Sequence, residues 1–509
     1  MWPALITLVL SCTVFLSLKS FLDEKRRGRL PPGPRGWPLI GNVLDFPTTQ
    51  QWKTFAQWGE KWGPLMSISL LGRRMVIINS AKVAVEMLDK KSTIYSNRPK
   101  FIVAGEMVGW ETIGSMIQYG PRYRDTRRLY SQLMGSREKV NGLKSQVELA
   151  SRKFLLRLLR KPEDLPAQLR LMAASTMLML AYGYTVQENE DPIVKAVEIA
   201  MGEATRALSP GAFLVEVFPI LKHVPEWVPG FAWKKEAKVM KRNLQNMCDM
   251  PFEFAKKQMA AGTDIPNLTS RNLPSCTDPE REQLLKDAAS AIYAGKCGSD
   301  TTVSSITSFF LAMMCYPEVQ RRAQEEIDTI IGTDRLPTLA DRDSLPYVSA
   351  VCSEVMRMFV TVPTGFPHVL SEDDVHDGHY LPKDTFIIAN IWQFCRDSAT
   401  YADPFVFNPD RFLSSEGKVA EPDPRKLIFG FGRRVCPGAD FADAVIFETC
   451  AVSLAVYNVS KPIKDGVTVE PSMEMTSGVI VHPEPFEVSI KPRSAKAEAL
   501  IRSAEELED

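Results

Sequence analysis

The sequence predicts a mainly α-helical protein with small β-sheets, and three observations lead to this prediction. The stretch from Asp278 to Cys315 has the features of one long helix, because Asp278 can cap its start and Pro279 suits its first turn. Pro317 lies just past its expected end. Most of the remaining chain also has helical character. Short strand patterns are limited to residues 64–70, 74–80 and 384–390.

The composition is that of an ordinary globular protein. The chain has 509 residues, of which 45% are hydrophobic and 24% are charged. Its 61 basic residues are balanced by 61 acidic residues, so no net field attracts nucleic acid or an acidic substrate. We therefore expect no nucleic-acid partner.

The first residues read as a membrane anchor. Residues 2–18 carry no charge, and a helix of this length covers roughly 25 Å of the ~30 Å hydrocarbon core. Extension to Leu22 closes the gap if Lys19 reaches back to the interface. Four basic residues follow within 25–29, which places the rest of the chain in the cytosol by the positive-inside rule. The alternative is a cleaved signal peptide, in which the charges usually come first.

A proline- and glycine-rich stretch, "LPPGPRGWPLIGN" at 30–42, cannot be helical and is expected to act as a stiff spacer. The predicted organisation is an anchor at 1–24, a basic and proline-rich hinge at 25–42, one large catalytic domain at 43–492 and a short solvated tail at 493–509.

The centre of the long predicted helix is unusual. "AGKCGSDTT" at 294–302 places two glycines in a helix interior, where each costs about 1 kcal/mol relative to alanine. Asp300, Thr301 and Thr302 follow directly, and a threonine hydroxyl can open a helix locally by bonding to the preceding turn. The pattern indicates a distorted helix that leaves room for a flat ligand and supplies proton-carrying groups. A solvent-facing polar patch is the alternative interpretation.

A second helix is expected to start near Ser344 and to contain "EVMR", in which Glu354 and Arg357 share one face. As an exposed pair these two residues would contribute little. Arg411, in "NPDRF", could join them as the third member of a buried network, in which an unpaired partner would be costly. The expected role is structural.

One cysteine stands apart from the other eight. None of the nine belongs to a CxxC pair or has zinc-site spacing, which indicates reduced thiols. Cys436, however, lies in "FGFGRRVCPGADFAD" at 429–443, among glycines and beside Arg433 and Arg434. Cations and backbone N–H groups stabilise a thiolate, so Cys436 is expected to be present in the charged form.

These stretches carry a family resemblance. The pattern F-x-x-G-x-R-x-C-x-G is met by Phe429, Gly432, Arg434, Cys436 and Gly438. Together with "GSDTT", "EVMR" and "NPDRF" in this order, it resembles the cytochrome P-450 superfamily of haem-thiolate monooxygenases. The N-terminal anchor and the "PPGP" hinge resemble the membrane-anchored microsomal type. Several short stretches of the sequence are similar to those of fungal members that modify terpenoids, polyketides or alkaloids.

The resemblance implies a cofactor, haem b, and roles for ten residues. Cys436 would bind the iron, because a thiolate donates electrons that favour cleavage of the O–O bond. Gly298 would leave room for dioxygen, and Asp300 and Thr301 would deliver protons to it. The residues expected around the haem and its propionates are Arg434, Arg127 (with Arg124 and Arg128 as rivals), Tyr123 in place of the usual tryptophan, His368, Phe429 and Gly438.

The resemblance also implies partners and a location. Electrons would come from a membrane-bound NADPH–cytochrome reductase, steered by basic residues such as Arg128 and Arg433. The protein would lie in the endoplasmic reticulum membrane with its catalytic domain in the cytosol. The substrate would be a lipophilic small molecule, reached through a pocket lined by 101–117, 291–297, 360–366 and 477–479. The apolar segment 207–233 would either dip into the bilayer or form ordinary core.

Two other functions stay open at this point. A haem-thiolate isomerase or dehydratase would need no proton relay, so the Asp300–Thr301 pair argues against it. A non-catalytic haem-binding protein would need neither the relay nor an apolar pocket. The main prediction is a monooxygenase that hydroxylates a lipophilic molecule in fungal secondary metabolism, such as terpenoid biosynthesis.

Overall fold

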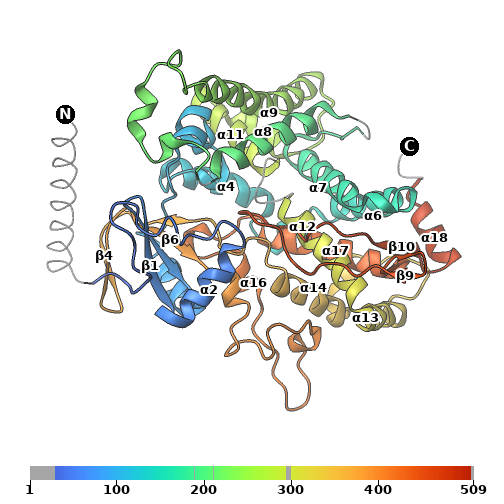
Figure 1. Cartoon of the computed structure of the whole chain (residues 1–509). Coiled ribbons are helices and arrows are strands. Elements are labelled where there is room, and N and C mark those ends of the chain that lie inside the picture. Colours follow the sequence, from blue (N-terminus) through green and yellow to red (C-terminus); the bar gives the residue numbers. More distant parts are fainter. Residues whose placement is uncertain (1–28, 188–189, 210, 294–299, 506–509) are drawn as a thin grey trace, which may run out of the picture.

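The structure is a computed structural model, which describes residues 29–187, 190–209, 211–293 and 300–505. Helices make up most of it, and the strands lie in two groups, one at the left and one at the right of the molecule (Figure 1). This arrangement confirms the predicted mainly helical class with small sheets.

The largest sheet has four short strands, β1 (Leu65–Leu70), β2 (Arg73–Ile78), β6 (Phe386–Ala389) and β3 (His368–Val369), in the order β1-β2-β6-β3. β2 and β6 are parallel, and the two outer pairs are antiparallel. All three predicted strands are present, with ends within two residues of the prediction. Helix α2 (Gln51–Trp62) packs its buried Phe55 against this sheet.

The described part of the predicted spacer lies along the edge of β1. The Ser67 N–H donates to the Pro32 carbonyl at 2.9 Å, and the Asn42 N–H donates to the Ser69 carbonyl at 2.6 Å. Gly41 has a φ of 65°, and a Cβ there would collide with the Ser69 carbonyl, so only glycine fits this contact. Residues 31–42 are non-helical as expected, but they belong to the folded domain because their backbone groups pair with a strand.

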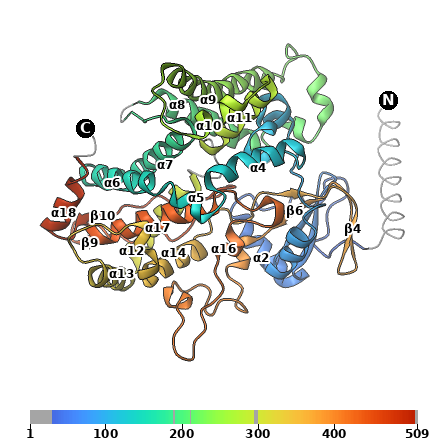
Figure 2. The same ribbon diagram turned by 180° about the vertical axis from the view of Figure 1, so that it is seen from behind.

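Five helices surround the main hydrophobic core, and four of them are buried along most of their length. They lie beside the four-stranded sheet, to its right in Figure 1 and to its left in Figure 2. These central helices are α6 (Lys144–Arg160), α7 (Leu165–Tyr182), α12 (Asp300–Cys315), α14 (Pro346–Met358) and α17 (Ala439–Val456).

The other helices cover this core. The longer ones are α4 (Pro121–Met134), α8 (Pro192–Leu208), α9 (Trp233–Ala261), α11 (Pro279–Tyr293), α13 (Pro317–Ile330) and α18 (Ala495–Arg502). The shorter ones are α3 (Ala81–Ala84), η1 (Val85–Lys90), η2 (Ile102–Val108), η3 (Trp110–Thr112), η4 (Gly114–Met116), α5 (Arg137–Asn141), η5 (Pro162–Asp164), η6 (Leu214–Glu216), η7 (Pro219–His223), α10 (Leu268–Asn272), η8 (Leu273–Ser275), η9 (Leu339–Ser344), α15 (Ile391–Phe394), η10 (Pro409–Phe412), α16 (Arg425–Ile428) and η11 (Gly432–Arg434). Three strand pairs complete the fold: β4 (Asp374–His376) with β5 (His379–Leu381), β7 (Tyr457–Ser460) with β10 (Ser489–Pro492), and β8 (Ile463–Lys464) with β9 (Val467–Thr468).

The long helix predicted for 278–315 is observed as α11 and α12. Both of its outer ends match the prediction, with Pro279 at the start of α11 and Cys315 at the end of α12. The stretch between them, with Gly298 and the expected distortion, lies outside the described residues. The helix predicted near Ser344 begins at Pro346.

Residues 495–502 of the predicted solvated tail instead form a docked helix, α18. Ser494 caps α18 by accepting a hydrogen bond from the Ala497 N–H at 3.1 Å. Ala497, Ile501 and Ala504 recur at helical spacing and are buried against the core. Their small size makes the apolar stripe inconspicuous in the sequence, which is why the tail was misread.

Two predicted membrane features have different outcomes. Within the described residues, no helix is both long and apolar enough to cross a membrane. The expected anchor at 1–24 lies outside those residues. The segment 207–233 is not ordinary core throughout, because four of its large apolar side chains are exposed: Leu214, Phe218, Ile220 and Trp227.

Candidate active site: a cysteine loop facing the start of α12

The cysteine loop, defined here as residues 429–438, connects α16 to α17. The Cys436 N–H donates to the Phe429 carbonyl at 2.8 Å, which closes the loop on itself. Gly432 has a φ of 54°, its N–H donates to a carboxylate oxygen of Asp89, and a Cβ there would collide with the Leu88 carbonyl. The loop is therefore held against η1, and glycine is required at the point of contact.

An ion-pair clamp joins the two ends of the cysteine loop. Arg425 on α16 donates from Nε to Asp443 on α17 at 2.6 Å and from Nη1 to the Ser353 hydroxyl at 2.9 Å. Arg342 adds a second contact to Asp443 at 2.7 Å. Asp443 is buried, but the two arginines keep its pKa below the ordinary value. The sequence analysis missed this clamp, although Asp443 ends the stretch that it singled out.

Arg434 points one unpartnered donor into the interior. Its Nε donates to the Ser96 carbonyl and its Nη2 to the Ile117 carbonyl, both at 2.7 Å. Its Nη1 is buried and has no hydrogen-bond partner among the described residues. Burial lowers the pKa of Arg434 to about 10, which reflects a guanidinium without a carboxylate beside it. Such a group fits an anionic ligand.

Tyr123 and Arg127, on α4, hold the cysteine loop from outside. The Tyr123 hydroxyl donates to the Arg433 carbonyl at 2.7 Å, and Arg127 Nη1 donates to the Val435 carbonyl at 2.7 Å. Tyr123 thus takes up a hydrogen-bonding role that a phenol can fill. The rivals of Arg127, namely Arg124 and Arg128, line a depression on the outer surface and not the internal cavity.

His368 lies buried near two arginines. Its Nδ1 lies 2.7 Å from the Tyr95 carbonyl, which can only accept, so Nδ1 carries the proton. Burial, Arg98 and Arg434 hold the pKa of His368 well below its usual value, so the ring is neutral. Arg98 donates from Nη1 to the Phe366 and Pro367 carbonyls at 2.6 and 2.9 Å. The sequence analysis missed Arg98, and its only signal was a cation in "SNRP", directly before a proline.

A single internal cavity brings most of the predicted site residues together. Of the ten, it contacts Thr301, Cys436, Arg434, Arg127, Tyr123, His368, Phe429 and Gly438. Asp300 lies beside the cavity but is not part of its lining, and Gly298 is outside the described residues. Of the segments expected to line the substrate pocket, three contribute: Gly114 and Ser115, Ala291 and Ile292, and four residues between Thr361 and Phe366. Residues 477–479 are not among the lining, and neither is Thr364.

The wall opposite the cysteine loop is the start of α12. Thr301 and Thr302 line the cavity there. Asp300 Oδ1 lies 3.0 Å from His482 Nε2, and 45% of the Asp300 side chain is exposed. The buried Ser304 hydroxyl donates to the Val481 carbonyl at 2.6 Å, which fixes the segment that carries His482 against the helix. His482 was missed because it lies 182 positions from Asp300 and belongs to no local motif.

The predicted three-membered network is confirmed. Arg357 binds both oxygens of Glu354 at 2.7 and 2.8 Å, and Arg411 reaches Glu354 at 3.2 Å. Glu354 and Arg357 are completely buried. Glu421 pairs with Arg411 at 2.7 Å, so two carboxylates balance two guanidinium groups. This network ties α14 to η10 and does not line the cavity.

Other cysteines have the surroundings of inert thiols. Burial raises the pKa of Cys248 and of Cys395 to about 12, and raises the pKa of Cys450 well above its ordinary value. Cys436 instead borders both the internal cavity and the outer depression. This contrast supports the exceptional position predicted for Cys436.

Comparison with known proteins identifies the family. The family model described as "Cytochrome P450" matches residues 31–490. The chain belongs to the cytochrome P450 family. It is 52% identical to cytochrome P450 monooxygenase 208 of Postia placenta, over 95% of this chain and 94% of that protein. It is 44% identical to cytochrome P450 monooxygenase claR of Ampulloclitocybe clavipes, over 94% of this chain and 89% of that protein. It is also 37% identical to monooxygenase ppsD of Aspergillus oryzae, over 98% of this chain and 96% of that protein.

Membership of the cytochrome P450 family establishes the general class of activity. This P450 is a haem-dependent monooxygenase, an oxidoreductase that binds haem b through a cysteine thiolate and uses a redox partner and a small-molecule substrate. The residues in the cavity fit that cofactor. The buried, unpartnered Nη1 of Arg434 suits a haem propionate, and the apolar lining suits the porphyrin.

Proposed function

We propose that this P450 hydroxylates a lipophilic small molecule, with Cys436 as the haem ligand. The observation that carries this proposal is the cavity that both Cys436 and Thr301 line, together with the unpartnered Nη1 of Arg434 beside it. Bound haem would supply the oxygen-activating chemistry of thiolate-ligated iron. Each of the residues below would hold that group or serve the reaction around it.

Four cavity residues would bind and orient the cofactor. Arg434 would donate from its Nη1 to a propionate carboxylate, and the buried Arg98 beside it would add positive charge. His368, kept neutral, would keep its Nδ1 bond to the Tyr95 carbonyl and leave the opposite ring nitrogen for the propionate side. Phe429 would pack against the porphyrin beside the thiolate. Tyr123 and Arg127 would keep the cysteine loop in position through its carbonyls.

Protons would reach the cavity along the start of α12. His482 is 29% exposed and pairs with Asp300, so it can exchange protons with solvent and pass them to the carboxylate. Asp300 would relay them to the neighbouring Thr301 hydroxyl, which faces the cavity. Gly298 would leave space beside the relay.

The substrate would be apolar. The lining away from the cysteine loop comes mainly from aliphatic and aromatic side chains, such as Ile292, Val362 and Phe366, with Thr361 and Ser305 as polar contacts. The similarity to fungal monooxygenases supports a role in fungal secondary metabolism, and we propose terpenoid-type scaffolds as the first to test.

The redox partner would be an NADPH–cytochrome reductase. The outer depression beside Cys436 is lined by five basic residues against one acidic residue, Asp440. This excess of positive charge would steer an acidic partner surface to the side of the molecule nearest the thiolate. The basic residues are Arg124, Arg127, Arg128, Lys139 and Arg433.

We also propose that the protein is held at the endoplasmic reticulum membrane by residues 1–24, with residues 25–42 as the basic and proline-rich link to the catalytic domain. Exposed apolar side chains support membrane contact by the domain itself: Trp227 and Ile220 are 79% and 73% exposed. Arg73 of β2 bonds the Glu216 carbonyl, which ties the segment that bears them to the sheet. Leu39, on the link, and Leu44, just after it, are exposed as well.

One experiment tests the function and the ligand together. The protein is expressed with a P450 reductase in a host fed terpenoid scaffolds, and products heavier by one oxygen are sought by mass spectrometry. Wild type should give such products and, when reduced under carbon monoxide, the Soret band typical of axial sulfur. Cys436→Ser should lose both, whereas Cys276→Ser, on a half-buried thiol elsewhere, should keep both. An unchanged spectrum in Cys436→Ser would exclude Cys436 as the ligand, and dependence of products on peroxide without NADPH would exclude the monooxygenase cycle.

A further inference from the structure

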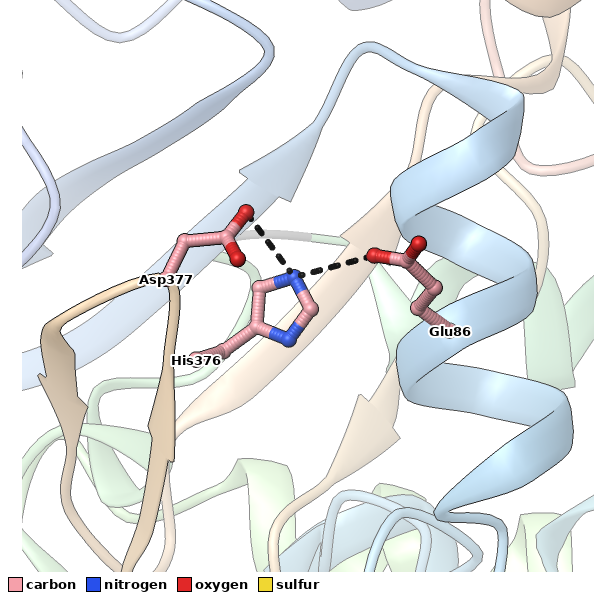
Figure 3. Close-up of side chains that lie close together, drawn as sticks. All are labelled: Glu86, His376 and Asp377. Carbon is pink, nitrogen blue, oxygen red and sulfur yellow. Dashed lines mark ion pairs between the residues drawn. The ribbon is translucent and has the colours of Figure 1, made fainter.

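A small cluster of ligating side chains lies apart from the haem cavity. The β4–β5 hairpin leans on η1, and Asp374 fixes its base by accepting from Lys91 Nζ and the Tyr95 hydroxyl, both at 2.7 Å. Above this base, Glu86 of η1 faces His376 and Asp377 of the hairpin (Figure 3). None of these three residues lines the haem cavity.

His376 is buried, and its Nε2 makes no hydrogen bond among the described residues. The residue is 6% exposed. Nε2 lies 3.5 Å from Asp377 Oδ2 and 3.8 Å from Glu86 Oε2, and both distances are too long for a normal hydrogen bond to a carboxylate. The ring nitrogen nevertheless points between the two carboxylates (Figure 3). A buried polar atom in this position calls for a ligand that the protein itself does not supply.

The spacing fits a metal ion. Two ligands held about 2.0–2.2 Å from one ion at a tetrahedral angle lie roughly 3.3–3.6 Å apart. The nitrogen–oxygen distances are close to this range, and all three ligand atoms lie within 4.8 Å of one another. Asp377 is 72% exposed and Glu86 is 30% exposed, so small side-chain rotations can close the remaining gap and solvent can complete the coordination.

The donor set selects the kind of ion. One imidazole nitrogen with two carboxylate oxygens suits zinc and similar divalent transition ions, whereas calcium and magnesium prefer oxygen donors throughout. We propose that Glu86, His376 and Asp377 form a site for a divalent transition-metal ion, for which zinc is the best match, with water in the fourth position.

The place of the site suggests what a bound ion does. Glu86 and Asp89 are on the same short helix, and Asp89 accepts the Gly432 N–H of the cysteine loop. An ion between Glu86 and His376 therefore ties the hairpin to the helix that supports the loop. It acts as a structural brace and takes no part in the reaction.

The test uses the full-length haem protein without a histidine tag. After removal of loosely bound metal with a chelator, the protein is dialysed against micromolar zinc chloride, and zinc and haem iron are measured together by mass spectrometry. Wild type should retain one zinc per haem. His376→Ala and Glu86→Gln should bind zinc at least roughly tenfold more weakly, since even outer-shell partners of a metal site contribute this much. Equal zinc retention by wild type and His376→Ala would overturn the proposal, as would a wild type that retains none.

A matched control and a second measurement keep the result clear. His379 is the cross-strand neighbour of His376 but lies outside the cluster, so His379→Asn should bind zinc like wild type. Zinc should raise the Tm for loss of haem absorbance by about 2 °C or more in wild type and not in Asp377→Asn, a change on an exposed turn. Equal rises in both, or loss of zinc from His379→Asn, would contradict the assigned ligands. The carbon monoxide spectrum tests the haem site independently, so the two proposals fail separately.

Discussion

The two walls of the haem cavity are built in different ways. The cysteine loop is fixed by bonds that run from cations and hydroxyls to main-chain carbonyls, and the buried Arg425–Asp443 clamp closes its ends. The opposite wall, at the start of α12, depends on Thr301 and on a half-exposed pair, Asp300 with His482. The first wall is suited to keep a metal ligand still, and the second is suited to let protons pass. Rigid geometry and solvent access are thus divided between the two sides of one cavity.

The largest effect is expected when a charge is removed from the buried network of Glu354, Arg357 and Arg411. Arg357→Ala leaves Glu354 buried and only partly paired, and should lower the free energy of unfolding by about 3–5 kcal/mol. The measurements are denaturant unfolding and the haem content of the purified protein. As a control, Arg321→Ala removes an exposed pair on α13 and should change stability by less than about 1 kcal/mol. Equal effects of the two changes would mean that the buried network contributes no more than an exposed pair.

A pH test examines the helix that follows the cysteine loop. Burial, assisted by Glu148, raises the pKa of Glu448 on α17 to about 8. Because this pKa is above the value in the unfolded chain, the stabilising contribution is complete below about pH 4.5 and is lost as the pH rises toward 8. A change of this size corresponds to roughly 3–5 kcal/mol.

Glu448→Gln should therefore flatten the fall in unfolding free energy between pH 5 and 8, measured by denaturant titration at each pH. Glu148→Gln should flatten it only in part, since burial is the larger cause. A wild-type stability that stays level across this range would contradict the assignment of Glu448.

The next prediction concerns the carboxylate of Asp300 at the start of α12. Asp300→Asn keeps the shape of the side chain but cannot carry a proton, so the rate of product formation should fall roughly 100-fold. The carbon monoxide spectrum should not change, because Asp300 does not line the cavity. His482→Gln should cause a smaller loss, because water can replace the histidine at an exposed site. Full activity in Asp300→Asn would mean that protons enter elsewhere.

The smallest effect is expected from removal of the Thr301 hydroxyl. Thr301→Ala removes one hydrogen-bonding group from the cavity and should raise the peroxide released per NADPH roughly tenfold, as expected for a bond of about 1.4 kcal/mol. Thr301→Ser keeps the hydroxyl and serves as the control. If both variants release as little peroxide as wild type, Thr301 has no part in the relay.

The sequence predicted the parts of this site whose residues lie close together in the chain. The cysteine loop, the Glu354–Arg357 pair and the three short strands all follow from neighbouring residues, and Arg411 was correctly added as the partner of Glu354. Contacts between distant segments were missed. Neither His482 beside Asp300 nor Arg342 beside Asp443 has a local pattern that points to its partner.

The structure also differs from the sequence-based prediction in the proline-rich spacer and in the C-terminal tail. Proline and glycine at 30–42 exclude a helix and predict a stiff spacer, yet backbone groups in this stretch pair with the edge of β1. The C-terminal stretch was read as solvated because its buried face consists largely of alanines, such as Ala497 and Ala504. In both cases the conformation depends on a distant part of the fold against which the segment packs. The spacing of residues along the chain does not identify that part.

The contact at Gly432 has a consequence for the order of assembly. Its N–H binds Asp89, 343 positions earlier in the chain, and the backbone on both sides leaves no room for adjustment. The cysteine loop can reach its final shape only after the first and last fifths of the polypeptide have met, and contacts of such long range are slow to form. The Cys436 thiol is therefore expected to take its final position only late in folding.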